Sequence, residues 1–168
     1  MIHQYSLADY QLVIGWKAIA EKLNLRDREG NLLTNFVIGG PGEDGQGSFV
    51  GQIVVNRTQD LFTTTGDATG SWVHDKNLNK TGTITVDITQ ISDDIITLVQ
   101  LCQIFESIQS NVPGLELSIN SVSSGVSTTM VTGKDCLIQK LPELPLAETA
   151  GRLSWVFTCG QVIYEYSR

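Results

Sequence analysis

The residues best suited to bind phosphate form a glycine-rich run from Gly39 to Gly47. It contains the G-x-G-x-x-G spacing of dinucleotide-binding loops, at Gly40, Pro41, Gly42, Glu43, Asp44 and Gly45. Such a loop needs a preceding strand, a following helix and free backbone N–H groups for the phosphates. Here Pro41 removes a donor, Glu43 and Asp44 would repel phosphate, and a strand-like segment follows. We therefore predict a solvated loop that serves assembly, and no nucleotide cofactor.

Candidate metal ligands are spread thinly along the chain. Glu43, Asp44 and Asp67 carry the oxygen atoms that Ca²⁺ prefers, but they come from two loops without the alternating pattern of a calcium loop. His3 and His74 have no Cys or His neighbour at the spacing of a zinc site. The sequence therefore predicts no metal site, and His74 is interpreted as a partly exposed strand residue.

Nucleophilic catalysis would need a Ser, Thr or Cys beside a base and a group that orients the base. Hydroxyl groups are plentiful, but His3 lies near the terminus, and Cys102 and Cys159 fall among apolar residues. Both cysteines are expected to be buried small side chains rather than reactive thiols. The Asp93-Asp94 pair is explained by the first turn of a helix. We expect a structural protein and not an enzyme.

The composition indicates one domain over residues 1–168, with a long loop insertion at 21–47. Eleven basic and eighteen acidic residues give a formal charge of −7, which disfavours general attraction to nucleic acid. Three cysteines without tight spacing indicate a reduced compartment and no disulfide framework. There is no signal peptide and no apolar run of about 20 residues for a membrane helix. We expect a soluble β-rich protein made in the cytoplasm.

The clearest strand pattern is Thr81–Gln90, which the other elements must position. Apolar residues at 84, 86 and 88 fall on one side of an extended chain, and polar residues fall on the other. Such a strand has one face in a core and one in water. The wet side has no Lys or Arg and carries Thr83, Thr85, Asp87 and Thr89.

The remaining segments predict a mainly β fold, an antiparallel sandwich or barrel with one flanking α-helix. Ser92 is expected to cap the one convincing helix, from Asp93 to about Gln109. The Leu141–Leu146 segment, with two prolines, is expected to be an extended connection. Further strands are predicted at Tyr10–Ala20, Ser48–Arg57, Leu115–Val122, Thr128–Val131, Lys134–Lys140 and Arg152–Thr158, with a hairpin of Leu61–Thr65 and Ser71–Asp75. We expect an interruption of the first strand near Gly15, a break at Gly133, and a continuation of the last strand beyond Gly160, over Gln161–Tyr166.

This order of elements resembles the tail tube proteins of contractile-tailed bacteriophages. The residues that carry the resemblance lie within 48–105, in the runs Phe49–Arg57, Phe62–Gly70, His74–Val86 and Gln90–Ser92. They combine a polar turn, a Thr-Gly-Thr-Ile-Thr strand and a Ser-capped helix. The resemblance implies hexameric rings that stack into a hollow tube, in which strands of neighbouring subunits join into one inner β-barrel. Type VI secretion and pyocin tube proteins share this fold.

The resemblance also implies roles for named residues and partners. Thr83, Thr85, Asp87 and Thr89 would line the lumen, and the Gly40–Gly45 loop would stack rings. The Ser48–Arg57 strand would pair beside the Thr81–Gln90 strand. The partners would be further copies of the chain, the tail sheath, baseplate and terminator proteins, and DNA that passes without specific binding. The protein would reside in the virion tail.

Charge fits a channel that conducts DNA. Six copies of a −7 subunit sum to −42, and a lumen with Asp87 and no basic residues would repel phosphates during ejection. Two other interpretations stay open. One is a monomeric β-sandwich that binds carbohydrate through Trp16, Trp72 and Trp155, and the other is the tube of a secretion or pyocin-like system.

Overall fold

The computed structural model describes residues 6–24, 26, 29–32, 35–40, 50–90, 92, 94–109, 111–123 and 126–166. A short 3₁₀ helix at Leu7–Asp9 leads into the first strand. Two helices and nine strands follow in this order: β1 Tyr10–Gly15, α1 Lys17–Leu23, β2 Asn35–Gly39, β3 Val50–Arg57, β4 Phe62–Gly66, β5 Trp72–Lys76, β6 Gly82–Thr89, α2 Asp94–Ser107, β7 Leu115–Ser123, β8 Val126–Ile138 and β9 Arg152–Tyr164.

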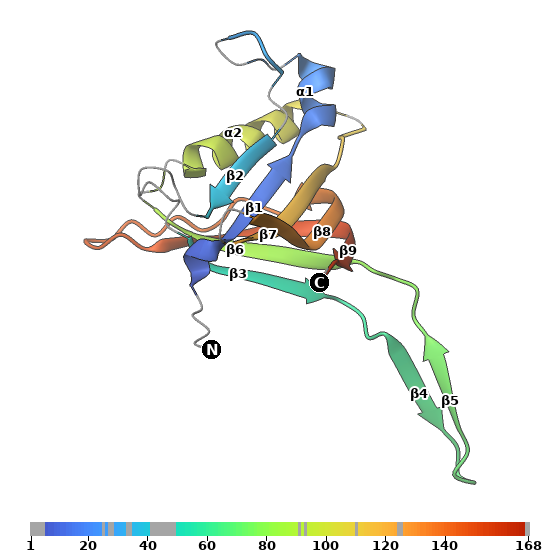
Figure 1. The fold of residues 1–168 in the computed structure, drawn as a ribbon. Helices are drawn as coiled ribbons and strands as arrows, with labels where there is room; N and C mark the ends of the chain where they lie inside the picture. The colour runs from blue at the N-terminus through green and yellow to red at the C-terminus, as the bar shows by residue number, and fades with distance from the viewer. Residues whose placement is uncertain are drawn as a thin grey trace.

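Seven strands form one curled antiparallel sheet in the order β2-β1-β7-β8-β9-β6-β3, and β4 pairs only with β5 in the described part of the chain. The β4–β5 hairpin projects away from the sheet (Figure 1). The mainly β fold with a flanking helix is confirmed, and so are the hairpin and the pairing of β3 beside β6. No helix within the described ranges is long and apolar enough to cross a membrane.

The sheet buries one face because its strands alternate. Ile84, Val86 and Ile88 of β6 are fully buried, while the polar residues between them keep partial exposure. On the neighbouring β9, Trp155 lies opposite Val86 and Phe157 lies opposite Ile84, so the two largest fully buried side chains lie on β9 against β6. Alternation in the sequence therefore predicted the buried face of β6 correctly.

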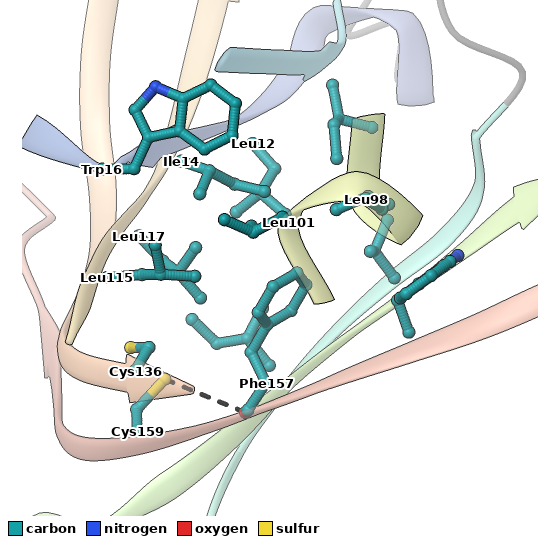
Figure 2. Packing of buried hydrophobic residues seen from close by; sticks show 14 of the residues in the cluster. Leu12, Ile14, Trp16, Leu98, Leu101, Leu115, Leu117, Cys136, Phe157 and Cys159 are labelled. Atoms are coloured by element: carbon teal, nitrogen blue, oxygen red, sulfur yellow. Dashed lines mark hydrogen bonds between the residues drawn. The ribbon is translucent and has the colours of Figure 1, made fainter. Parts of the chain in front are cut away.

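Helix α2 covers the buried face of the sheet. Figure 2 shows Leu98 and Leu101 among Leu12, Ile14 and Phe157. The Ser92 hydroxyl oxygen accepts the backbone N–H of Asp94 at 3.4 Å, so the predicted cap is present, while Asp93 lies outside the described residues. The helix ends at Ser107, two residues before the predicted end.

The interruption predicted near Gly15 is present, but the residues after it form a helix and do not continue the strand. The structure thus adds a short helix, α1, to the predicted flanking helix. Strand β1 ends at Gly15, and α1 begins at Lys17. Leu12 and Ile14 are both fully buried and lie two residues apart, as on one face of a strand. Ile19 and Ala20 are also fully buried but adjacent in sequence, which fits a helix and not the alternation of a strand. Asn24 ends α1 in the left-handed conformation, with φ of 53°.

The predicted break of β8 at Gly133 was also wrong. The strand continues through Gly133, because glycine is needed there for close packing and not for a turn. A Cβ at this position would lie 2.9 Å from the Cys136 sulfur and 3.0 Å from the Cys159 sulfur. Strand β9 continues through Gly160 to Tyr164, as the sequence predicted.

The core between β6 and β9 gives a direct stability prediction. Phe157→Ala removes a fully buried ring and leaves a cavity, so we expect a loss of about 3–5 kcal/mol in the free energy of unfolding. Urea denaturation followed by circular dichroism measures this loss. Thr158→Ala, on the exposed side of the same strand, is the matched control and should change the free energy by no more than about 0.5 kcal/mol. Equal losses in the two variants would contradict the assigned faces.

Candidate assembly surfaces

The four predicted lumen residues lie together on one surface that spans three adjacent strands. Residues opposite one another in an antiparallel pair point to the same side of the sheet. The polar side chains of β6 therefore share one surface with the side chains opposite them on β3 and β9. Asp87 lies between Gln52 and Ser154, and Thr83 lies between Asn56 and Thr158. We call this surface the polar face; it consists of Gln52, Val54, Asn56, Thr83, Thr85, Asp87, Thr89, Arg152, Ser154, Val156 and Thr158.

The carboxylate of the polar face is held in place by a neighbour. The Ser154 hydroxyl donates to the Asp87 Oδ1 atom at 2.5 Å, across the β6–β9 pair. A hydrogen bond from a hydroxyl orients the carboxylate along the face, in the middle of the β6 strand. The negative charge therefore has a fixed place among uncharged side chains.

The polar face includes one basic residue, which comes from β9, while β6 itself contributes no Lys or Arg. Arg152 lies opposite Thr89, and its guanidinium extends across β6 to Gly51 of β3. Gly51 is the extra residue of a bulge, and a Cβ there would lie 2.6–2.7 Å from three guanidinium atoms. The glycine thus makes room for the cation. Near the end of β6 the polar face carries both signs of charge.

Strand β3 forms one edge of the sheet. Within the described residues its eight members pair only with β6, which leaves a row of backbone donors and acceptors on the other side. Long edge strands are templates for pairing with another chain, and proteins shield them with charge, proline or a cover. The β3 sequence, Val-Gly-Gln-Ile-Val-Val-Asn-Arg, has no proline and one charged residue at its end.

The β4–β5 hairpin, which we call the arm, continues from β3 and β6. At its base the Thr58 N–H and hydroxyl each lie 3.1 Å from the Thr81 carbonyl oxygen, and the two hydroxyls are 2.8 Å apart. All residues of both arm strands are exposed. A two-stranded hairpin without a third strand or a helix has only marginal stability in water, so the arm requires a partner to become rigid.

One side of the arm is rich in aromatic and basic side chains. Phe62 lies opposite Lys76, Thr64 lies opposite His74, and Trp72 lies opposite Gly66. These six residues share one side, which we call the aromatic face. Trp72 is 67% exposed and Phe62 is 55% exposed. The Thr64 hydroxyl and the His74 Nδ1 atom are 2.8 Å apart and line a shallow hollow with Phe62.

The tip of the arm is a closed turn around Asp67. The Oδ1 atom accepts the backbone N–H groups of Thr69 at 2.9 Å and Ser71 at 3.0 Å, and the Thr69 hydroxyl at 2.6 Å. These bonds, the Thr69 hydroxyl first, lower the pKa of the exposed Asp67 carboxyl. Asp67 therefore stabilises the turn, and this role accounts for a carboxylate at this position without a calcium ion.

The other candidate chemical groups do not assemble into a site in the described part of the chain. His3, Pro41, Gly42, Glu43, Asp44 and Gly45 lie outside it; Gly40 lies within it, with φ of +84°. No group of three potential metal ligands occurs within the ranges that the structure describes.

The cysteines are buried, as the sequence predicted for Cys102 and Cys159. Burial, with the nearby Glu106 charge, raises the pKa of the Cys102 thiol to about 11. The hydrogen bond with Cys159 and burial raise the pKa of the Cys136 thiol. A thiol with a raised pKa has little of the nucleophilic thiolate at neutral pH.

Two features of the surface were not predicted from the sequence. The aromatic face was missed, although Phe62 and Trp72 fall at positions of the predicted hairpin that place them on one side. Arg152 was missed because its place beside Thr89 depends on the pairing of β9 with β6. Alternation along β9 indicates the side of the strand on which Arg152 lies, but it does not indicate which residues of other strands lie beside it.

A curled sheet with an open edge and a projecting arm is the form of a subunit built for assembly. The family model of the bacteriophage PhiTE tail tube protein matches residues 34–165, and the chain belongs to this family. The protein is thus a structural component of a phage tail, and the resemblance to tail tube proteins is confirmed.

The fold is similar to that of a solved structure. The cryo-EM structure of the tube terminating cap of the anti-feeding prophage matches with a TM-score of 0.54 and 10% identity, over 99% of this chain and 95% of that chain. At this identity the match concerns the fold alone. No curated protein shows significant similarity to the chain.

The exposed arm predicts a contrast in backbone protection within the isolated subunit. Amides of β4 and β5 should exchange hydrogen about a hundredfold faster than those of β6, because the arm opens without unfolding the core. Hydrogen–deuterium exchange with peptide-level mass spectrometry measures both in one sample. Equal protection would mean that the arm is stable without a partner.

Proposed function

We propose that the chain is the repeating subunit of a tail tube, forming hexameric rings that stack into a hollow tube through which DNA passes. The observation that supports this most is the polar face: three adjacent strands with water-compatible side chains outward and a dry core behind. The wall of a water-filled channel needs polar side chains toward the lumen and an apolar core behind them. In this proposal Thr83, Thr85, Asp87 and Thr89 line the lumen.

The open edge of β3 supports closure into a ring. Barrel closure pairs every strand on both sides and removes exposed edges. Barrels of 16–18 strands already leave an aqueous channel, so a barrel shared by several subunits is wider still. In this proposal β3 of one copy pairs with the sheet of the next copy.

The chemistry of the polar face suits passage of DNA. Phosphate binding grows with the number of Lys and Arg contacts that release counterions. Arg152 is the only basic residue among those that form the face, it lies at one end, and Asp87 lies on the same face. The remaining members are neutral, so a duplex would slide past them without firm attachment.

The proposal extends to the parts of the particle around the tube. We propose one domain per chain, with residues 21–47 as an elaboration, and ring stacking by the Gly40–Gly45 loop. The sheath, baseplate and terminator proteins are proposed partners, and the host cytoplasm is the proposed site of synthesis. The same argument holds for a secretion or pyocin-like tube, which differs in cargo.

The carbohydrate-binding alternative finds little support. Trp16 is 7% exposed and Trp155 is fully buried, so neither indole offers a surface for a sugar ring. Trp72 is exposed, but a single indole on an arm is a weak platform for a glycan.

Negative-stain microscopy of the concentrated, purified chain tests the proposal. A tube subunit has adhesive surfaces on both sides of its ring and should give stacked rings or long hollow tubes. A protein that caps a tube has one such side and would stop at single or paired rings. A monodisperse monomer at high concentration would contradict the proposed function.

A charge reversal tests the lumen assignment. Asp87→Lys should still assemble, because the residue faces away from the core, but it should slow genome delivery since a ring of cations binds phosphate. The measurement is the DNA ejection rate of particles carrying the variant. Glu106→Lys makes the same charge change on the exposed side of α2, across the core from the polar face, and should eject normally. Normal ejection by intact Asp87→Lys particles would contradict the assignment of Asp87 to the lumen.

A further inference from the structure

A second exposed apolar segment lies at the end of the sheet opposite to the arm. Between β8 and β9 the chain runs through Leu141-Pro142-Glu143-Leu144-Pro145-Leu146, without regular secondary structure. The three leucines are 51%, 64% and 86% exposed in chain order. In Figure 1 this connection protrudes beyond one end of the sheet while the arm extends beyond the other. We call it the leucine segment.

The leucine segment is anchored at its base and stiff along its length. The Gln90 side chain, at the end of β6, donates from Nε2 to the Pro145 carbonyl at 2.5 Å and accepts the Gly151 N–H at 2.8 Å. The Gln90 backbone N–H donates to the Gly151 carbonyl at 3.0 Å. Each proline fixes its own φ and restricts the residue before it. Its apolar side chains are therefore held in water at a defined place.

The aromatic face of the arm is chemically complementary to this segment. Pro142 and Pro145 have the P-x-x-P spacing of extended segments that dock on aromatic grooves. Phe62, Thr64 and His74 line a hollow of about 380 Å³ that has room for an aliphatic side chain or a proline ring. Glu143 of the leucine segment and Lys76 of the aromatic face carry opposite charges, and both are exposed.

The dimensions also agree. Five steps from Leu141 to Leu146 cover about 15 Å in an extended proline-type conformation. The aromatic face runs over five residues of β4, from Phe62 to Gly66, and these four steps cover about 13 Å in a strand. The arm projects well away from the sheet (Figure 1). The arm is therefore long enough to reach beyond its own subunit.

The two surfaces lie at opposite ends of β6, so they cannot meet within one copy. Contact between two different patches of identical subunits is head-to-tail. When the rotation that relates the subunits does not close into a ring, such contacts build an open-ended stack. Stacked rings require this type of contact. We propose that the aromatic face of one subunit binds the leucine segment of a subunit in the adjoining ring. This inference rests on the proposed tube.

A crosslinking experiment tests the contact directly. Chains carrying Trp72→Cys are mixed with chains carrying Leu144→Cys, assembled, and treated with a copper–phenanthroline thiol oxidant. The native cysteines are buried, so they contribute little background. We expect a disulfide-linked dimer that forms on assembly and is absent from unassembled subunits. The matched control replaces Leu144→Cys by Ile96→Cys, on the exposed side of α2, and should give no dimer.

A charge exchange tests the same contact without new cysteines. Lys76→Glu and Glu143→Lys should each raise the protein concentration needed for assembly about threefold per contact, multiplied over the contacts of a ring. The double variant should return to the parental value. Sedimentation of tubes measures this concentration, and thermal unfolding of the monomer verifies that each variant is folded.

The outcomes separate the two claims. Tubes that form without the crosslink, or a double variant that is not rescued, would overturn the contact and leave the proposed tube intact. A crosslink that appears in single rings would place the contact within a ring and overturn the stacking role. Absence of any rings or tubes from the parent chain would overturn the proposed function and this contact with it.

Discussion

The packing of β6 against β9 is the interaction on which the other features depend. Val86 meets Trp155 and Ile84 meets Phe157 on the buried side, where the indole and the phenyl ring are fully enclosed. Burying side chains of this size stabilises the fold by about 1.5–3 kcal/mol each. The same register brings Asp87 beside Ser154 and Thr89 beside Arg152 on the other side. A slip of one residue would exchange the two faces, so the core and the polar face have a common origin.

A single curled sheet also leaves problems that the isolated chain does not resolve. Within the residues that the structure describes, its β3 edge carries unpaired backbone groups, its arm has no supporting element, and its leucine segment exposes aliphatic side chains. Each of these is costly or hazardous in a monomer. In the proposed tube all three gain a partner. The family to which the chain belongs is one whose members form tail tubes.

The sequence predicted the parts of the fold that follow from local patterns. The alternation in Thr81–Gln90 determined the buried side of β6, and the Ser92 cap located the start of α2 within about one turn. Spacing alone misread Tyr10–Ala20, because the part after Gly15 is too short to show a clear helical period. The role of Gly133 needed the two sulfur atoms around it, one of which comes from another strand. Arg152 joined the polar face through long-range register, which no local pattern contains.

If the polar face of β3, β6 and β9 faces a channel shared by several copies, a cryo-EM reconstruction of assembled tubes will show it. We expect a hollow tube in which the Thr83, Thr85 and Asp87 side chains point toward the axis and β3 pairs with the adjacent copy. Density that places these side chains on the outer surface of the tube would show that the polar face does not line a channel.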